Sequence, residues 1–324
     1  MLLRLFKNNS PIMHLFTIII AVLLWLPVFR NPEWVPTVTD TSFLNCNFNA
    51  LFGSAWIGQL IAFGLMLIEA FFLLRIDLKF MLVEERTIMP PLFFVLIVSV
   101  LANSHSLISV LIANAFFIIT LLQILDSNRN PDQYKRYFES GLSLGIAAVI
   151  YPPITAMLFF LFSTLFVLRY FNIREFFASI LGFVVPFIFF LFYMFMTDRT
   201  PEFFTNISRI AAQQDINTSL TIVQYSGIIF FALLAVVGGA TMTNYIRMYK
   251  VTTRKYFSLF IWMTVLSILA FFLIPCSTLT LLTPAAIALT FIITLFFTKT
   301  RYNAFKEILF GLILISSFLV VYFR

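Results

Sequence analysis

The stretch FFASILGFVVPFIFFLFYMFM, residues 176–196, decides the fold class. It contains no charged residue, and a helix needs about 20 apolar residues to cross the hydrocarbon core of a bilayer. Similar apolar runs occur at 11–29, 55–74, 90–102, 107–125, 138–151, 154–168, 220–242, 257–274, 280–298 and 308–322. The sequence therefore predicts an all-α, polytopic transmembrane helix bundle with about eleven crossings, or about nine if a short pair is re-entrant. We expect one membrane domain over residues 1–324.

The composition supports the same conclusion. Hydrophobic residues make up 61% of the 324 residues and charged residues only 11%, whereas a soluble domain has roughly 25% charged residues. The net charge is +7, but the basic residues form no continuous run. The electrostatic pattern of a nucleic-acid-binding protein is therefore absent, and we expect no nucleic-acid partner. The sequence also lacks a nucleotide-binding glycine loop, a zinc-protease HExxH motif and a GxSxG motif.

The basic residues predict the orientation. With the N-terminus in the cytoplasm and alternating helices, all but four of the 21 Lys and Arg residues fall on inner segments. Positive charge accumulates on cytoplasmic loops, so we predict a multi-pass protein of the cell inner membrane. The four exceptions are Arg30, Arg199, Arg209 and Arg324.

The predicted outer loops contain the candidate site residues. The first loop, 30–54, contains Asp40, and the tight turn 103–106 contains His105. In the loop 197–219, the apolar residues of the segment 201–214 share one helical face. This pattern predicts a short interfacial helix parallel to the outer membrane surface.

Each of these residues permits two interpretations. Asp40 could act as a general base or as a ligand for Mg or Mn, because hard cations prefer oxygen ligands; alternatively, it is a solvated loop residue. His105 could contact a phosphate or transfer a proton, or simply face water in its turn. Arg199, Arg209 and Arg30 could bind a substrate phosphate, or anchor the protein at lipid headgroups.

Two features lie within the predicted helices. Glu69 is an acid inside an apolar run, and such acids are functional candidates; because the run ends at 74 and Arg75 follows, we expect Glu69 to extend toward the inner interface and pair there. Gly141 and Gly145 have the GxxxG spacing that permits close helix packing.

The chain resembles an uncharacterised family of Phe-rich polytopic inner-membrane proteins from Bacteroidota. The resemblance rests on three stretches: the start that ends Asn8-Asn9-Ser10-Pro11, the turn Asn103–Ser106 followed by Asn114, and the segment from Gly141 to Pro153. More loosely, the layout is similar to GT-C membrane glycosyltransferases and O-antigen polymerases, whose first outer loop carries an acidic residue. Asp40 matches that acid, but a second acidic motif is replaced here by His105.

This resemblance implies a cell-envelope protein that transfers sugar from a polyprenyl-phosphate donor at the outer face of the membrane. Two alternatives remain open. One is a flippase or transporter of lipids or lipid-linked oligosaccharides, and the other is a non-catalytic membrane subunit of an envelope complex. Membrane lipids are expected partners in every case, and the sequence names no protein partner.

Overall fold

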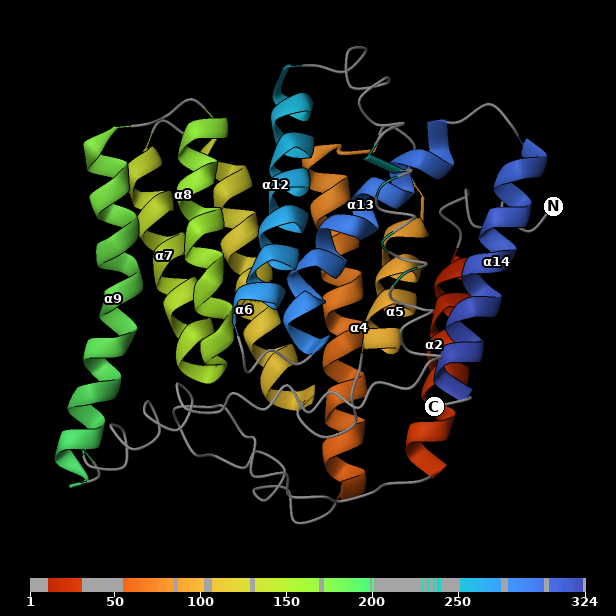
Figure 1. Ribbon diagram of the computed structural model, residues 1–324, viewed down its shortest axis with the longest axis horizontal. Coiled ribbons are helices and arrows are strands. Elements are labelled where there is room, and N and C mark those ends of the chain that lie inside the picture. Colours follow the sequence, from red (N-terminus) through yellow and green to blue (C-terminus); the bar gives the residue numbers. More distant parts are fainter. Residues whose placement is uncertain are drawn as a thin grey trace.

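The fold is taken from a computed structural model that describes residues 11–30, 55–83, 87–101, 107–128, 132–168, 172–198, 251–274, 279–299 and 303–322, together with single residues between 200 and 239. Over these ranges the chain forms helices and turns, which confirms the all-α prediction (Figure 1). The α-helices are α2 (Pro11–Arg30), α4 (Ala55–Phe80), α5 (Met89–Leu101), α6 (Leu107–Ser127), α7 (Gln133–Ile150), α8 (Met157–Val167), α9 (Ile173–Met196), α12 (Val251–Leu273), α13 (Thr283–Lys299) and α14 (Asn303–Tyr322). Two short 3₁₀ helices, η1 (Pro152–Ala156) and η3 (Leu279–Leu282), precede α8 and α13.

The helices match the predicted apolar runs, apart from the run 220–242, most of which lies outside the described residues. The ends differ most in α4 and α12. The predicted run 55–74 continues as helix to Phe80, and the run predicted from 257 already starts at Val251. These additional turns contain basic residues, namely Arg75 and Lys79 in α4 and Arg254 and Lys255 in α12. A helix accommodates them because long basic side chains can place their charges in water.

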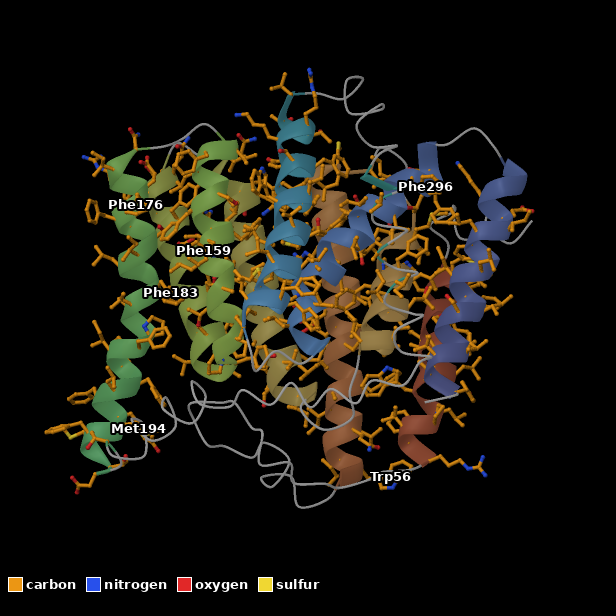
Figure 2. The ribbon with its side chains drawn as sticks, in the orientation of Figure 1. Trp56, Phe159, Phe176, Phe183, Met194 and Phe296 are labelled. Carbon is orange, nitrogen blue, oxygen red and sulfur yellow. The ribbon has the colours of Figure 1, made fainter. Side chains whose placement is uncertain are left out.

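The surface of the bundle is apolar. Within the described residues, five helices are long and apolar enough to cross a membrane: Ile12–Arg30, Trp56–Phe80, Ile108–Ser127, Ile173–Met196 and Val251–Leu273. Large side chains on the outside are widely exposed, such as Phe159 at 68% and Phe272 at 79% (Figure 2). Monomeric soluble proteins rarely expose continuous apolar surface of this extent to water. The chain is therefore a membrane protein.

Helix α5 lies between α4 and the helices α2 and α14 (Figure 1), and all of its residues are buried. It packs against α2, α4, α13 and α14, and Phe93 contacts the rings of Phe297 at 5.3 Å and Phe310 at 6.1 Å. At 13 residues it is about 20 Å long, shorter than the roughly 30 Å hydrocarbon core. Because protein encloses α5, its length does not have to match the lipid.

Helices α7 and α9 make the closest helix–helix contact. A Cβ atom added to Gly141 would overlap the backbone oxygen of Ser179, and one added to Gly182 would overlap that of Phe138. Gly145 likewise faces the backbone of Phe183 and the ring of Pro186. The predicted packing role of Gly141 and Gly145 is confirmed, and Gly182 completes the contact from α9.

Basic side chains join the helices at one end of the bundle, which we call the basic end. Lys79 pairs with Asp126 at 2.7 Å and thereby joins the ends of α4 and α6. Lys255 of α12 donates to the Leu168 carbonyl oxygen at 2.9 Å, and Lys306 of α14 donates to that of Phe297 at 2.6 Å. The opposite end carries the last turns of α2, α7 and α9 (Figure 1). The basic end corresponds to the predicted cytoplasmic side; that assignment stays a prediction.

Candidate functional site

Most residues of the predicted site lie outside the described part of the chain. These are Asp40, His105, Arg199 and Arg209, as well as the predicted interfacial helix at 201–214. Arg30 is described: it is the last residue of α2 and is exposed. The structure therefore places one predicted phosphate-binding residue, Arg30, at the end of the bundle opposite the basic end. That the other predicted site residues cluster there stays a prediction.

The two ends of the first predicted outer loop lie next to each other. Phe29, just before the loop, stacks on Trp56, just after it, with ring centroids 6.0 Å apart and planes at 14°. Phe63 packs edge-on against Phe29 at 5.8 Å. The loop that contains Asp40 thus starts and ends on neighbouring helices, beside the exposed Arg30.

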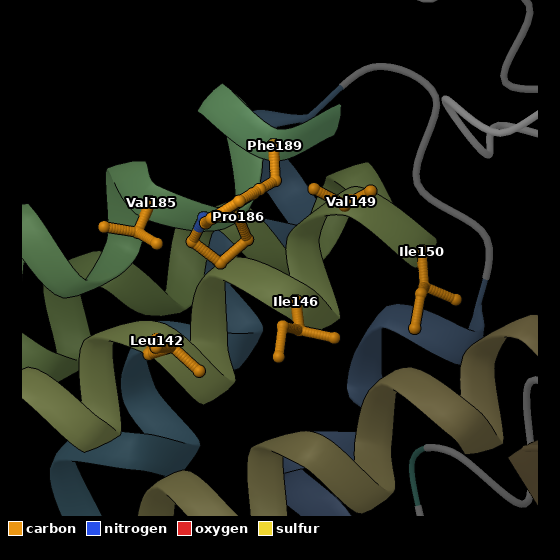
Figure 3. Close-up of a pocket in the computed structure, with 7 residues that line it drawn as sticks. All are labelled: Leu142, Ile146, Val149, Ile150, Val185, Pro186 and Phe189. Atoms are coloured by element: carbon orange, nitrogen blue, oxygen red, sulfur yellow. The ribbon is translucent and has the colours of Figure 1, made fainter. Parts of the chain in front are cut away.

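An apolar groove runs along the contact between α7 and α9 (Figure 3). Its volume is about 400 Å³, within the range of small-molecule sites. It is lined by Leu142, Ile146, Val149 and Ile150 from α7, and by Val185, Pro186 and Phe189 from α9. These residues belong to the second half of each helix, so the groove lies toward the opposite end of the bundle.

The sequence explains where this groove forms. Gly141, Gly145 and Gly182 bring the two helix backbones together, whereas larger side chains beside this contact, such as those of Ile146 and Phe189, line the groove. Val149 packs there against the buried Phe190 and Met194. The groove is open to the surface of the bundle, and Phe189 is 70% exposed at its rim. A ligand could therefore enter sideways, from the lipid.

Glu69 forms a buried polar contact within the bundle. It is 2% exposed, and its Oε2 accepts a hydrogen bond from Asn114 Nδ2 at 2.8 Å. The expectation that Glu69 extends to the inner interface is wrong, because α4 continues six residues past the predicted end and leaves Glu69 near its middle. Arg75 is exposed on the same helix. Sequence reasoning missed the role of Asn114, although an amide in the middle of the apolar run 107–125 was an available signal.

The described residues contain no group of three or more His, Cys, Asp or Glu side chains that could hold a metal ion. Asp40 lies outside those residues, so its predicted role as a Mg or Mn ligand remains a prediction. Comparison with known proteins found no matching family model, no matching curated protein and no matching solved structure. The functional argument therefore rests on the chain itself.

Proposed function

We propose that this membrane protein handles a polyprenyl-phosphate lipid at the outer face of the cell inner membrane, as a GT-C-like glycosyltransferase of cell-envelope glycan or glycolipid biogenesis. The groove between α7 and α9 carries the proposal. It is apolar, opens to the surface of the bundle and lies at the end of the bundle from which the chain continues to Arg199. A polyprenyl chain needs such an apolar site, and its phosphate needs positive partners near the membrane surface.

The residues would divide the work as follows. The polyprenyl chain lies in the groove, and Arg199 and Arg209, which follow α9 in the chain, bind the phosphate. Arg30, the third predicted phosphate-binding residue, ends α2 at the opposite edge of the bundle from α9 (Figure 1), so it is not assigned to this phosphate. The acceptor oxygen bonds to the anomeric carbon of the sugar, the bond from that carbon to the phosphate oxygen breaks, and the lipid phosphate leaves. Asp40 takes the acceptor proton, or it would instead hold a Mg or Mn ion that would stabilise the negative charge of the phosphate. His105 contacts the phosphate or transfers a proton.

Binding of polyprenyl phosphate to the purified protein tests the proposal. Replacing Ile146 with Trp fills the groove, so we expect at least a tenfold weaker affinity by native mass spectrometry. Ile315→Trp is the matched control, because Ile315 is an exposed residue of α14 far along the chain from the groove. Equal affinities for the lipid in both variants, or equal binding of phosphatidylglycerol and polyprenyl phosphate by the unchanged protein, would contradict the proposed ligand.

Activity separates the proposed transferase from its alternatives. With polyprenyl-phosphate-linked sugars from native membranes as donor, Asp40→Asn should abolish release of polyprenyl phosphate while membrane insertion stays normal. A flippase would use the same lateral groove, since it also binds a lipid from the bilayer. It would move the lipid between leaflets without breaking a bond, so lipid movement that is intact in Asp40→Asn and reduced in Ile146→Trp would favour it.

A further inference from the structure

Glu69 lies near the middle of a membrane-spanning helix. It follows Trp56 by 13 residues and precedes Phe80 by 11, which at 1.5 Å per residue is about 20 Å and about 17 Å along the axis. Its neighbours in the core include Met66, Ala70 and Leu73, all buried and apolar. A charge at this depth is strongly unfavourable unless a partner compensates it.

No basic side chain compensates Glu69 within the described residues. Helix α5 has no titratable residue, and Asp126, the one titratable residue of α6, pairs with Lys79 at the basic end. On α2, the ring of His14 contacts Phe71 at 5.7 Å, and Arg30 lies at the far end of the helix. On α4 itself, Arg75 is exposed and the Asp77 carboxylate accepts from the Val83 backbone N–H.

Two oxygen atoms of the contact lack a hydrogen-bond partner among the described residues. They are Glu69 Oε1 and Asn114 Oδ1, both buried. An amide oxygen is always an acceptor, and so is each oxygen of a carboxylate. A proton on Oε1 would turn that oxygen into a donor, and Asn114 Oδ1 is the acceptor without a partner in the same contact.

We propose that Glu69 and Asn114 form a proton-binding site inside the membrane. Glu69 holds the proton as a neutral carboxylic acid and donates it from Oε1 to Asn114 Oδ1, while Asn114 Nδ2 donates to Oε2. The result is a cyclic acid–amide pair that joins α4 to α6. This inference does not depend on the proposed transferase activity.

A metal ion fits the site less well than a proton. Hard cations such as Ca²⁺ and Mg²⁺ take about six or more oxygen ligands, whereas the contact offers two side-chain oxygens that lack a hydrogen-bond partner. The backbone carbonyls of α4 and α6 around it are hydrogen-bonded within regular helices. A proton requires only one donor oxygen and one acceptor oxygen.

The pair makes α4–α6 packing dependent on the proton. Loss of the proton would leave a carboxylate oxygen facing the amide oxygen of Asn114, and two acceptors repel each other. Proton release would therefore require entry of water or separation of the two helices. Acids within membrane-spanning segments are found in proton relays.

Infrared spectroscopy of the full-length protein at neutral pH tests the proposal. Glu69→Gln preserves both hydrogen bonds, because the glutamine amide can donate to Oδ1 and accept from Nδ2, so this variant should fold. We expect the difference spectrum between the unchanged protein and Glu69→Gln to contain the carbonyl band of a protonated carboxyl group, shifted after exchange into D₂O. Loss of carboxylate bands in that difference spectrum would overturn the proposal.

Two further variants sharpen the result. Glu139→Gln is the matched control, since Glu139 forms a partly exposed ion pair with Arg136 at 3.0 Å and should lose carboxylate bands instead. Asn114→Leu removes the acceptor, so the acid band of Glu69 should move to the higher frequency of a carboxyl group without a hydrogen bond. An acid band at unchanged frequency in Asn114→Leu would refute the acid–amide pairing.

Discussion

Lys79 and Asp126 join two parallel helices at the basic end. The Lys79 side chain is 44% exposed and that of Asp126 is 11% exposed, so the pair is partly shielded from water. The Lys79 ammonium group also lies 5.2 Å from the ring centroid of Phe80, and that ring packs edge-on against Tyr256 of α12 at 5.8 Å. The ion pair is therefore part of a contact among three helices.

At the residue scale, we predict that this ion pair stabilises the fold more than a typical surface pair. Lys79→Met should lower the free energy of unfolding by about 1–2 kcal/mol, because the Asp126 carboxylate loses a charged hydrogen bond in a shielded place. A double-mutant cycle with Asp126→Asn, followed by reversible SDS titration, measures the coupling. Arg136 and Glu139 provide the control pair: both are about a third exposed, and ion pairs at this helix spacing contribute about 0.2–0.5 kcal/mol. Equal coupling energies for the two pairs would contradict the prediction.

At the element scale, the contact between α7 and α9 depends on the absence of side chains. We predict that Gly182→Ala lowers the thermal stability in detergent, because the added methyl group meets the Phe138 carbonyl oxygen and such overpacking costs about 1–3 kcal/mol. Gly311→Ala is the control, since a Cβ there meets no atom within 4 Å. Its melting temperature should stay the same or rise slightly. A Gly182→Ala protein as stable as the control would show that the helices can separate without loss.

The helices were largely predictable, since a membrane-spanning helix consists of one long apolar run. Their ends were less so: α4 continues past Arg75 to Phe80, because helix formation does not stop where apolarity stops. The same error misplaced Glu69. The pairing of Gly141 with α9 and of Glu69 with α6 depends on which helices become neighbours, and local sequence does not encode that. The groove was missed for the same reason, since its lining residues look like ordinary lipid-facing side chains.

At the scale of the whole molecule, the distribution of basic residues predicts a cytoplasmic basic end. In a chain with Cys46 and Cys276 replaced by Ser, a cysteine introduced at Arg254 should react with a membrane-impermeant reagent only after the membrane is opened. A cysteine at Thr200 should react in intact cells, because Thr200 follows the last residue of α9, which lies at the end of the bundle opposite the basic end. Reaction of both cysteines from the same side would refute the topology.

The last helix closes the bundle against the first one. The Tyr322 hydroxyl of α14 donates to the Leu23 carbonyl oxygen of α2 at 3.0 Å, across 299 positions of the chain, and α14 also packs on the buried helix α5. During synthesis, α2 and α5 are made long before α14 can cover them, whereas α7 and α9 meet almost at once. A chain truncated before residue 303 would therefore keep the contact between α7 and α9 but lack the helix that covers α2 and α5. The exposed faces of α2 and α5 would make such a chain a substrate for membrane proteases.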